Sequence, residues 1–228
     1  MREIFVGLLL GDGNMQTFTQ KGKTWRFRIL QGGDNHFEYI KHLREIFNDW
    51  TVMNLKENHE INKIDTHPSP LRGDGWVLIT PQSLITPQSG IIGKIYKKWY
   101  FDTLSFEQFA ELGNAFYKLN SEGIRKKVLP IQLKEWLTDI SLAYWFMDDG
   151  SSKWKNKVLA LRFCTDSFSE LEIDILISIL KEKFDLNVTK TRHNKNKWRL
   201  YIGTADYPKI KDLIYPHLIP SMRYKFPI

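Results

Sequence analysis

Two stretches of the chain are apolar at almost every position and end in the same polar pair. Residues 5–13 read FVGLLLGDG, and residues 142–150 read LAYWFMDDG. A helix with apolar residues on every side belongs in a protein interior. The pattern therefore predicts two buried helices, each of which brings a carboxylate, Asp12 or Asp149, to the edge of a core. A buried carboxylate is costly unless a cation or hydrogen bonds stabilise it.

The residues after the first apolar stretch alternate and then change to helical spacing. Apolar side chains alternate with Arg26 and Arg28 over residues 24–31, which predicts a strand with one face in a core and the other carrying cations. Residues 36–49 and 105–119 have apolar positions at helical spacing, so each predicts a helix. Short strands are expected between these helices, near residues 51–56, 75–80 and 91–101.

The second half of the chain repeats this order. It has a predicted strand, then a helix, then a hairpin, then a final helix, over residues 157–164, 169–184, 187–203 and 206–217. Phe47 and Phe184 follow Asp12 and Asp149 at the same separation in sequence. Each half also ends in a basic residue shortly before a proline, in the segments KVLP and KFP.

The matching order, offset and ends predict a duplicated αββαββα unit and an α+β fold. We place the two repeats at residues 1–130 and 131–228, with a linker near residues 130–136. If the two apolar helices pack against each other, Asp12 and Asp149 come close together, and their charges conflict. A divalent cation would remove that conflict, and oxygen ligands without a Cys/His cluster favour Mg²⁺ over zinc.

Both apolar stretches resemble the LAGLIDADG motif, and the chain as a whole resembles the single-chain, two-repeat homing endonucleases encoded in organellar introns. The second copy departs from the motif at Tyr144, where the family usually has glycine. The resemblance implies two repeats related by a pseudo-twofold axis, with the motif helices packed between them and antiparallel sheets forming a saddle over DNA. It further implies metal-dependent, site-specific hydrolysis of both strands of a long, partly palindromic duplex.

The resemblance also assigns roles to residues near the two motifs. Asp12 and Asp149 correspond to the essential metal-binding carboxylates, one acting mainly on each strand. The backbone carbonyls of Gly11 and Asp148 are expected as additional metal ligands. The other expected catalytic residues are two lysines that stabilise charge or position water, and two polar residues beside the water network: Lys127, Lys225, Gln31 and Asp166.

The outward faces of the strands are expected to read the target. A two-stranded ribbon fits the major groove, where arginine and lysine contact guanine or phosphate. The expected DNA-binding residues are Arg26, Arg28, Lys190, Arg192, Lys197, Arg199 and Tyr201.

Charge and composition agree with a nucleic-acid partner. The net charge of the 228 residues is +7, which suits a polyanion. The one cysteine, Cys164, excludes an intrachain disulfide and a cysteine zinc site. No apolar run approaches the ~20 residues of a membrane span, and we expect no secretory signal and no membrane association. Frequent lysine, asparagine and isoleucine indicate an AT-rich gene, so we expect an organellar origin, mitochondrial or chloroplast. Because both motif copies lie in one chain, we also expect a monomer.

Two other functions use the same fold. Some family members are RNA maturases that help their own intron to splice, and intact aspartates in both motifs do not exclude that role here. A non-cleaving DNA-binding regulator is the second alternative. The segment HNKN at residues 193–196 hints at an HNH nuclease, but no cysteine pair or second histidine motif supports that class.

Overall fold

A computed structural model describes residues 1–19, 21–51, 55–63, 93–152, 158–195 and 197–226. The chain forms two compact units. The first contains Met1–Arg28 and Leu104–Ile228, and the second contains Ile29–Thr103. Both motif segments lie in the first unit.

The order of helices and strands runs through αββαββα twice. The first set comprises α1 (Arg2–Leu10), β1 (Asn14–Gln16), β2 (Arg26–Gly32), α2 (Phe37–Ile46), β3 (Lys56–Lys63), β4 (Gly93–Asp102) and α3 (Ala110–Phe116). The second comprises α5 (Asp139–Asp149), β7 (Gly150–Ser152), β8 (Leu161–Cys164), α6 (Glu170–Phe184), β9 (Val188–Asn194), β10 (Lys197–Ile202) and α7 (Tyr207–Ile214). The predicted α+β fold is therefore confirmed.

Between the two sets lie a small hairpin and a short helix, which are β5 (Tyr117–Leu119), β6 (Arg125–Lys127) and α4 (Leu133–Trp136). Short 3₁₀ helices complete the chain, at Asp34–His36, Asn48–Trp50, Glu107–Phe109, Thr204–Asp206, Tyr215–His217 and Pro220–Lys225.

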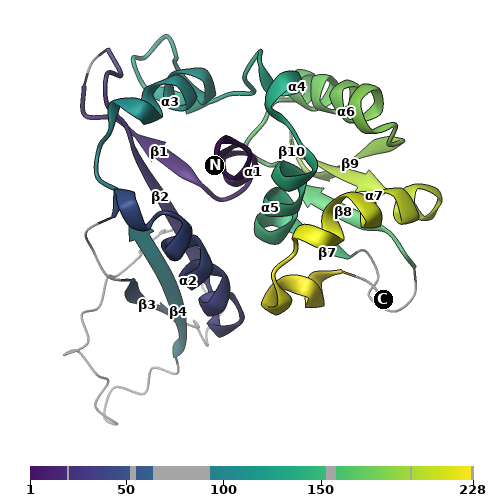
Figure 1. Ribbon diagram of the computed structural model, residues 1–228, viewed down its shortest axis with the longest axis horizontal. Coiled ribbons are helices and arrows are strands. Elements are labelled where there is room, and N and C mark those ends of the chain that lie inside the picture. The colour runs from purple at the N-terminus through teal and green to yellow at the C-terminus, as the bar shows by residue number, and fades with distance from the viewer. Residues whose placement is uncertain (20, 52–54, 64–92, 153–157, 196, 227–228) are drawn as a thin grey trace, which may run out of the picture. The chain divides into compact units, whose positions relative to one another are not determined.

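The two larger sheets have the same strand order, β1-β2-β4-β3 and β7-β8-β10-β9. In the first sheet, β2 crosses from the first unit into the second, so its start pairs with β1 and its end belongs with β4 and β3. The second sheet lies wholly in the first unit, where α6 and α7 lie beside it (Figure 1). The shared strand order supports a duplication, and the repeat boundary at residue 130 stays a prediction.

Several sequence-based boundaries were wrong, and two of them changed the type or the start of an element. The helix predicted over residues 105–119 ends at Phe116, because Tyr117 starts a strand that pairs with Lys127. The Tyr117 side chain is buried against Trp25, and its hydroxyl accepts a hydrogen bond from the backbone N–H of Met15. The strand predicted at residues 51–56 begins at Lys56 instead. The strand predicted at residues 75–80 lies outside the described residues.

Aromatic contacts tie the motif helices to the strands beside them. In the first half, Phe5 meets the ring of Phe27 at 5.3 Å between centroids. In the second, Trp145 and Phe146 meet Phe163 at 4.5 and 5.6 Å. Burial of a large apolar side chain contributes about 1.5–3 kcal/mol, so each motif helix is held firmly to strands of its own half.

Candidate active site

The first motif helix, α1, is buried over its last six residues, Phe5 to Leu10. It ends at Leu10, and the N–H of the next residue, Gly11, donates to the carbonyls of Gly7 and Leu8. The next turn is closed by the N–H of Gly13, which donates to the Leu8 carbonyl at 2.8 Å. Asp12 lies between these two glycines, immediately beyond the helix end.

The second motif helix, α5, is started by a capping box. The Thr138 side chain accepts from the N–H of Ser141, and the Ser141 hydroxyl accepts from the N–H of Thr138. Such a cap satisfies backbone donors that would otherwise lack partners at a helix start. Most of the helix is buried, and it ends at Asp149. Both predicted motif helices are thus present and buried.

The two motif helices pack directly against each other, side by side in Figure 1. A methyl group added at Gly7 would lie 2.4 Å from the Ser141 carbonyl oxygen and 2.8 Å from Cβ of Tyr144. Contacts that short are not tolerated between packed atoms, so the close approach depends on glycine in α1. Tyr144 stands in α5 at the position where the family usually has a second glycine, so at this crossing only α1 contributes a glycine.

The electrostatics of Asp149 show that the two motif aspartates influence each other. Burial raises the pKa of Asp149 most, and the negative charge of Asp12 raises it further, to about 7. The positive charges of Lys225 and Lys127 act in the opposite direction. The carboxylates thus come together, as the packing of the motif helices predicts, and their charge is only partly compensated by the protein.

Each motif helix end is contacted by a lysine from later in the same half. The ammonium of Lys127, at the end of β6, donates to the carbonyls of Gly11 at 3.1 Å and Gly13 at 2.8 Å. The ammonium of Lys225 donates to the carbonyls of Met147 and Asp148, the latter at 2.8 Å. The two predicted lysines therefore occupy corresponding positions, one at each motif.

Burial also changes the acidity of these lysines. It lowers the pKa of Lys127 to about 8, while the nearby aspartates act in the opposite direction. The pKa of Lys225 is lowered for the same reason. Removal from water disfavours a charged ammonium, so a lysine in this setting gives up its proton more readily than a surface lysine.

The oxygen ligands at the two motifs suit a hard cation that completes its coordination with water or phosphate. Within the described residues, no three His, Cys, Asp or Glu side chains are grouped so as to hold a metal alone. Asp12 and Asp149 supply carboxylate oxygens, which Mg²⁺ prefers, and Mg²⁺ commonly completes its shell with water and phosphate. The carbonyls of Gly11 and Asp148 accept from the two lysines, and their role as metal ligands stays a prediction.

The two polar residues expected beside the water network lie in different units. Asp166 follows β8 in the first unit, and its negative charge is close enough to raise the pKa of Asp149. One Asp166 oxygen lies 3.8 Å from both the guanidinium of Arg199 and the imidazole of His193. Gln31 lies on β2 in the second unit, where it is buried. The catalytic roles of both residues stay predictions.

The register of the first hairpin places its cations on one face. Arg28 pairs with Asn14 and Arg26 with Gln16, while Phe27 lies on the opposite, buried face. The Arg26 guanidinium donates twice to the Gln16 side chain, at 3.0 and 2.6 Å. The outward face predicted for Arg26 and Arg28 is therefore present.

In the second sheet, the outward face predicted for Lys190 and Arg192 was wrong. Directly opposed residues share a face, and Lys190 opposes the buried Leu200 while Arg192 opposes Trp198. These two cations therefore lie on the helix side of the sheet. The Lys190 ammonium confirms this, because it forms ion pairs with Glu170 and Asp174 of α6 at 2.8 and 2.7 Å, and so shares the face of α6.

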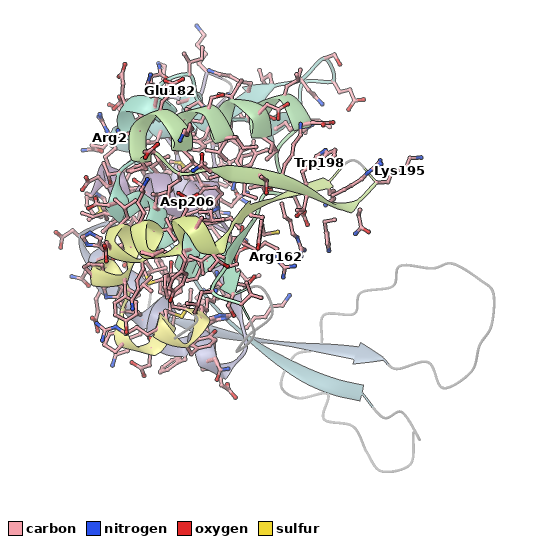
Figure 2. All side chains as sticks on the ribbon, turned by 90° about the vertical axis from the view of Figure 1, so that its right-hand side faces the viewer. Arg2, Arg162, Glu182, Lys195, Trp198 and Asp206 are labelled. Atoms are coloured by element: carbon pink, nitrogen blue, oxygen red, sulfur yellow. The ribbon has the colours of Figure 1, made fainter. Side chains whose placement is uncertain are left out.

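The other face of the second sheet carries residues that sequence reasoning partly missed. Arg199 and Tyr201 lie there as predicted, opposed on β8 by Cys164 and Arg162. Arg162 stands between the buried Leu161 and Phe163, and this alternation was a signal for an outward cation. Figure 2 shows Lys195 at the tip of the hairpin formed by β9 and β10, which projects past α6 and α7.

Two αββαββα sets whose first helices pack together and end in paired aspartates define the LAGLIDADG class of fold. The chain belongs to the LAGLIDADG DNA endonuclease family, whose profile matches residues 2–210. The predicted resemblance is thereby confirmed.

Individual relatives match over nearly the whole chain. DNA endonuclease I-ChuI of Chlamydomonas applanata is 29% identical over 98% of this chain and 93% of its own length. Probable intron-encoded endonuclease 1 of Wickerhamomyces canadensis is 30% identical over 98% and 82%. Cytochrome b mRNA maturase bI2 of Debaryomyces hansenii is 30% identical over 99% and 72%. The solved structure of the homing endonuclease I-WcaI bound to its DNA recognition sequence is similar with a TM-score of 0.73 and 27% identity, covering 100% of this chain and 86% of that one.

Among the described residues, the helices are all too short or too polar to span a membrane.

Proposed function

We propose that this protein is a site-specific endonuclease that hydrolyses one phosphodiester bond in each strand of a long DNA duplex, with Mg²⁺ as its cofactor. The observation that carries the proposal is the matched pair of sites at the ends of α1 and α5. Each site has one aspartate and one half-buried lysine, Asp12 with Lys127 and Asp149 with Lys225. Two equivalent sites suit a substrate with two equivalent scissile bonds.

The reaction draws on charges that the site already contains. Asp12 and Asp149 would hold the metal, which when bound polarises the phosphate and activates water. Burial and the repulsion from Asp12 together raise the pKa of Asp149, and both are relieved when a cation binds the pair. Lys127, with a pKa of about 8, stays mostly protonated at pH 7. Its ammonium is therefore available to stabilise negative charge at the phosphate.

The outward faces of the sheets would bind the duplex. Arg26 and Arg28 lie on such a face in the first half, and Arg162 and Arg199 do so in the second. Arginine side chains on an antiparallel ribbon can reach guanine in the major groove. Because the two halves carry different side chains, the target site should be only partly palindromic, and its affinity should fall steeply with salt. The likeness to I-WcaI, solved with its DNA recognition sequence, supports a duplex partner.

Further features follow from the same comparison. The single chain contains both motif copies, which supports a protein active as a monomer. The relative from Wickerhamomyces canadensis is intron-encoded by name, and the composition of this chain suits an AT-rich organellar gene. We therefore propose an origin in an organellar intron.

A second candidate function is assistance in RNA splicing. The observation that favours it is the 30% identity over nearly the whole chain to an mRNA maturase. The paired sites at α1 and α5 favour the nuclease, because catalytic carboxylates are not needed to bind RNA. Competition between intron RNA and duplex DNA for the protein would separate the two functions.

The proposal is tested by a cleavage selection. The protein is incubated with a randomised duplex library in Mg²⁺, with Ca²⁺ as control, and the cut ends are sequenced. Defined double-strand cuts around one sequence in Mg²⁺ alone are the expected result. A duplex that is retained in Ca²⁺ but never cut in Mg²⁺ would overturn the nuclease and leave a binding protein.

A further inference from the structure

Asp148 lies beside the two motif aspartates and has a contact that the proposed function does not use. It is the second-last residue of α5 and is only 6% exposed. One of its carboxylate oxygens accepts a hydrogen bond from the backbone N–H of Asp12, at 3.2 Å. The side chain of one motif thus holds the backbone of the other at the residue that carries the carboxylate.

The sequence leaves room for this contact on one side only. Gly11 occupies in the first motif the position that Asp148 occupies in the second. A methyl group added at Gly11 would lie 2.6 Å from Cβ of Asp148 and 2.7 Å from its carboxylate oxygen. The space between the helix ends therefore holds one side chain, which comes from α5, and Gly11 has no side chain with which to hold Asp149 in return.

We propose that Asp148 is a positioning residue that fixes the backbone of Asp12, so that the Asp12 carboxylate points into the site. This hydrogen bond holds the N–H of Asp12, which lies just beyond the end of α1. Asp148 itself acts through Asp12 and needs no contact with DNA. The inference rests on the proposed function for its catalytic consequence, and on the geometry alone for the contact.

The contact is tested first without any substrate. The exchange of the Asp12 amide hydrogen with solvent is measured by NMR in the wild type, in Asp148→Ala and in Asp148→Asn. Loss of the acceptor should speed exchange about tenfold in Asp148→Ala. The asparagine oxygen can still accept, so Asp148→Asn should stay near the wild-type rate. Equal exchange in all three proteins would overturn the inference.

The catalytic consequence is tested on the duplex recovered from the cleavage selection, with each strand labelled. Misplacement of one carboxylate should slow the strand that depends on Asp12 by about tenfold in Asp148→Ala, with a two- to threefold effect on the other strand. Duplex affinity in Ca²⁺ should not change. Asp148→Asn should cleave the Asp12-dependent strand at close to the wild-type rate. Equal slowing of both strands, or an asparagine variant as slow as alanine, would contradict a positioning role.

A third variant separates positioning from packing. Asp148→Leu keeps a side chain of similar size between the two helix ends but removes the hydrogen-bond acceptor. Its Asp12 amide should exchange as fast as in Asp148→Ala, whereas exchange near the wild-type rate would show that packing alone holds Asp12. This variant also replaces Asp148→Ala should the latter fail to fold. A wild type that cuts no duplex would refute the proposed function, whereas the amide measurement would still decide whether Asp148 holds Asp12.

Discussion

The ends of α1 and α5 are alike in chemistry and unlike in packing. Each ends beside an aspartate followed by glycine, and each receives a lysine from later in its own half, Lys127 or Lys225. Between the helices, however, glycine always lies on α1 and the larger residue on α5. Gly7 faces Tyr144, and Gly11 faces Asp148.

This difference shows that the duplicated halves kept the same reactive groups while dividing the packing between them. One helix supplies the space and the other fills it, so α1 and α5 fit each other better than either would fit a copy of itself. Two α5 helices packed in this way would bring two tyrosines together at one crossing, and overpacking of that kind is destabilising. The packing of α1 against α5 therefore suits a fused chain and not a symmetric dimer of half-chains.

The largest expected effect is the loss of cleavage of both strands when divalent cations are removed. Removal of divalent cations with a chelator should abolish cleavage of both strands, because Asp12 and Asp149 share the site and repel each other without a cation. The measurement is single-turnover cleavage before and after Mg²⁺ is restored, with duplex retention in Ca²⁺ as control. Cleavage of even one strand in the presence of chelator would show that the two halves do not depend equally on the cation.

The two lysines should contribute similarly despite their different surroundings. Lys127→Met and Lys225→Met each remove one half-buried ammonium, and each should lower the single-turnover rate about a hundredfold. Lys126→Met is the matched control, since Lys126 is an exposed neighbour on the same strand. A large loss for one lysine and none for the other would show that the halves differ in chemistry as well as in packing.

The division of packing predicts an asymmetric response to added methyl groups. Gly7→Ala places an atom against Ser141 and Tyr144 and should lower the free energy of unfolding by about 1–3 kcal/mol. Gly203→Ala meets nothing closer than 3.7 Å and should stay within about 0.5 kcal/mol of the wild type. Denaturant unfolding measures both. A neutral Gly7→Ala would show that the helices can separate without cost.

The smallest expected effect is a pH-dependent change in melting temperature, and it arises at the end of the second helix of one half. The residue after α6 is Asp185, which adopts a left-handed conformation and contacts Lys181 and Lys209 at 2.7 Å, whereas the residue after α2 is Phe47. The two lysines lower the pKa of Asp185 to about 2, from an ordinary value of 3.8. A carboxylate with a lowered pKa stabilises the fold above pH 4, and that contribution is lost as the pH falls toward 2.

Comparison of the wild type with Asp185→Asn at pH 5 and at pH 2 measures this contribution. The variant should melt at a slightly lower temperature than the wild type at pH 5, and the two should converge at pH 2. Asparagine tolerates the left-handed conformation, so backbone strain does not enter the comparison. A difference that is as large at pH 2 as at pH 5 would exclude the ion pairs as its cause.

Much of the fold could be predicted because its signals are local. The motif helices show as unbroken apolar runs, and the helix predicted over residues 169–184 is present as α6. The lysines at the site could be found because they recur at matching ends of the two repeats. The contact of Asp148 with Asp12 could not, because it depends on how closely α1 and α5 approach, which neither segment encodes alone.

The errors came from pairing between segments. The face of Lys190 was misread, although it follows the buried Val188 by two residues and so lies on the same side of β9. A register shift between Lys197 and Trp198 further alters the alternation at the tip of the hairpin. Tyr117 continued a helical pattern but became a strand residue, because pairing with Lys127 and burial against Trp25 outweighed local spacing.

In the proposed function, two unlike halves bring two equivalent sites side by side, and the aspartate of each is essential for double-strand cleavage. The most direct test of this claim is single-turnover double-strand cleavage by Asp12→Asn and by Asp149→Asn, with Asp139→Asn, at the opposite end of α5, as the matched control. Each motif variant should bind the duplex in Ca²⁺ as the wild type does and should lose about a thousandfold or more in rate, while the control should cleave normally. Intact double-strand cleavage by either motif variant would contradict the claim.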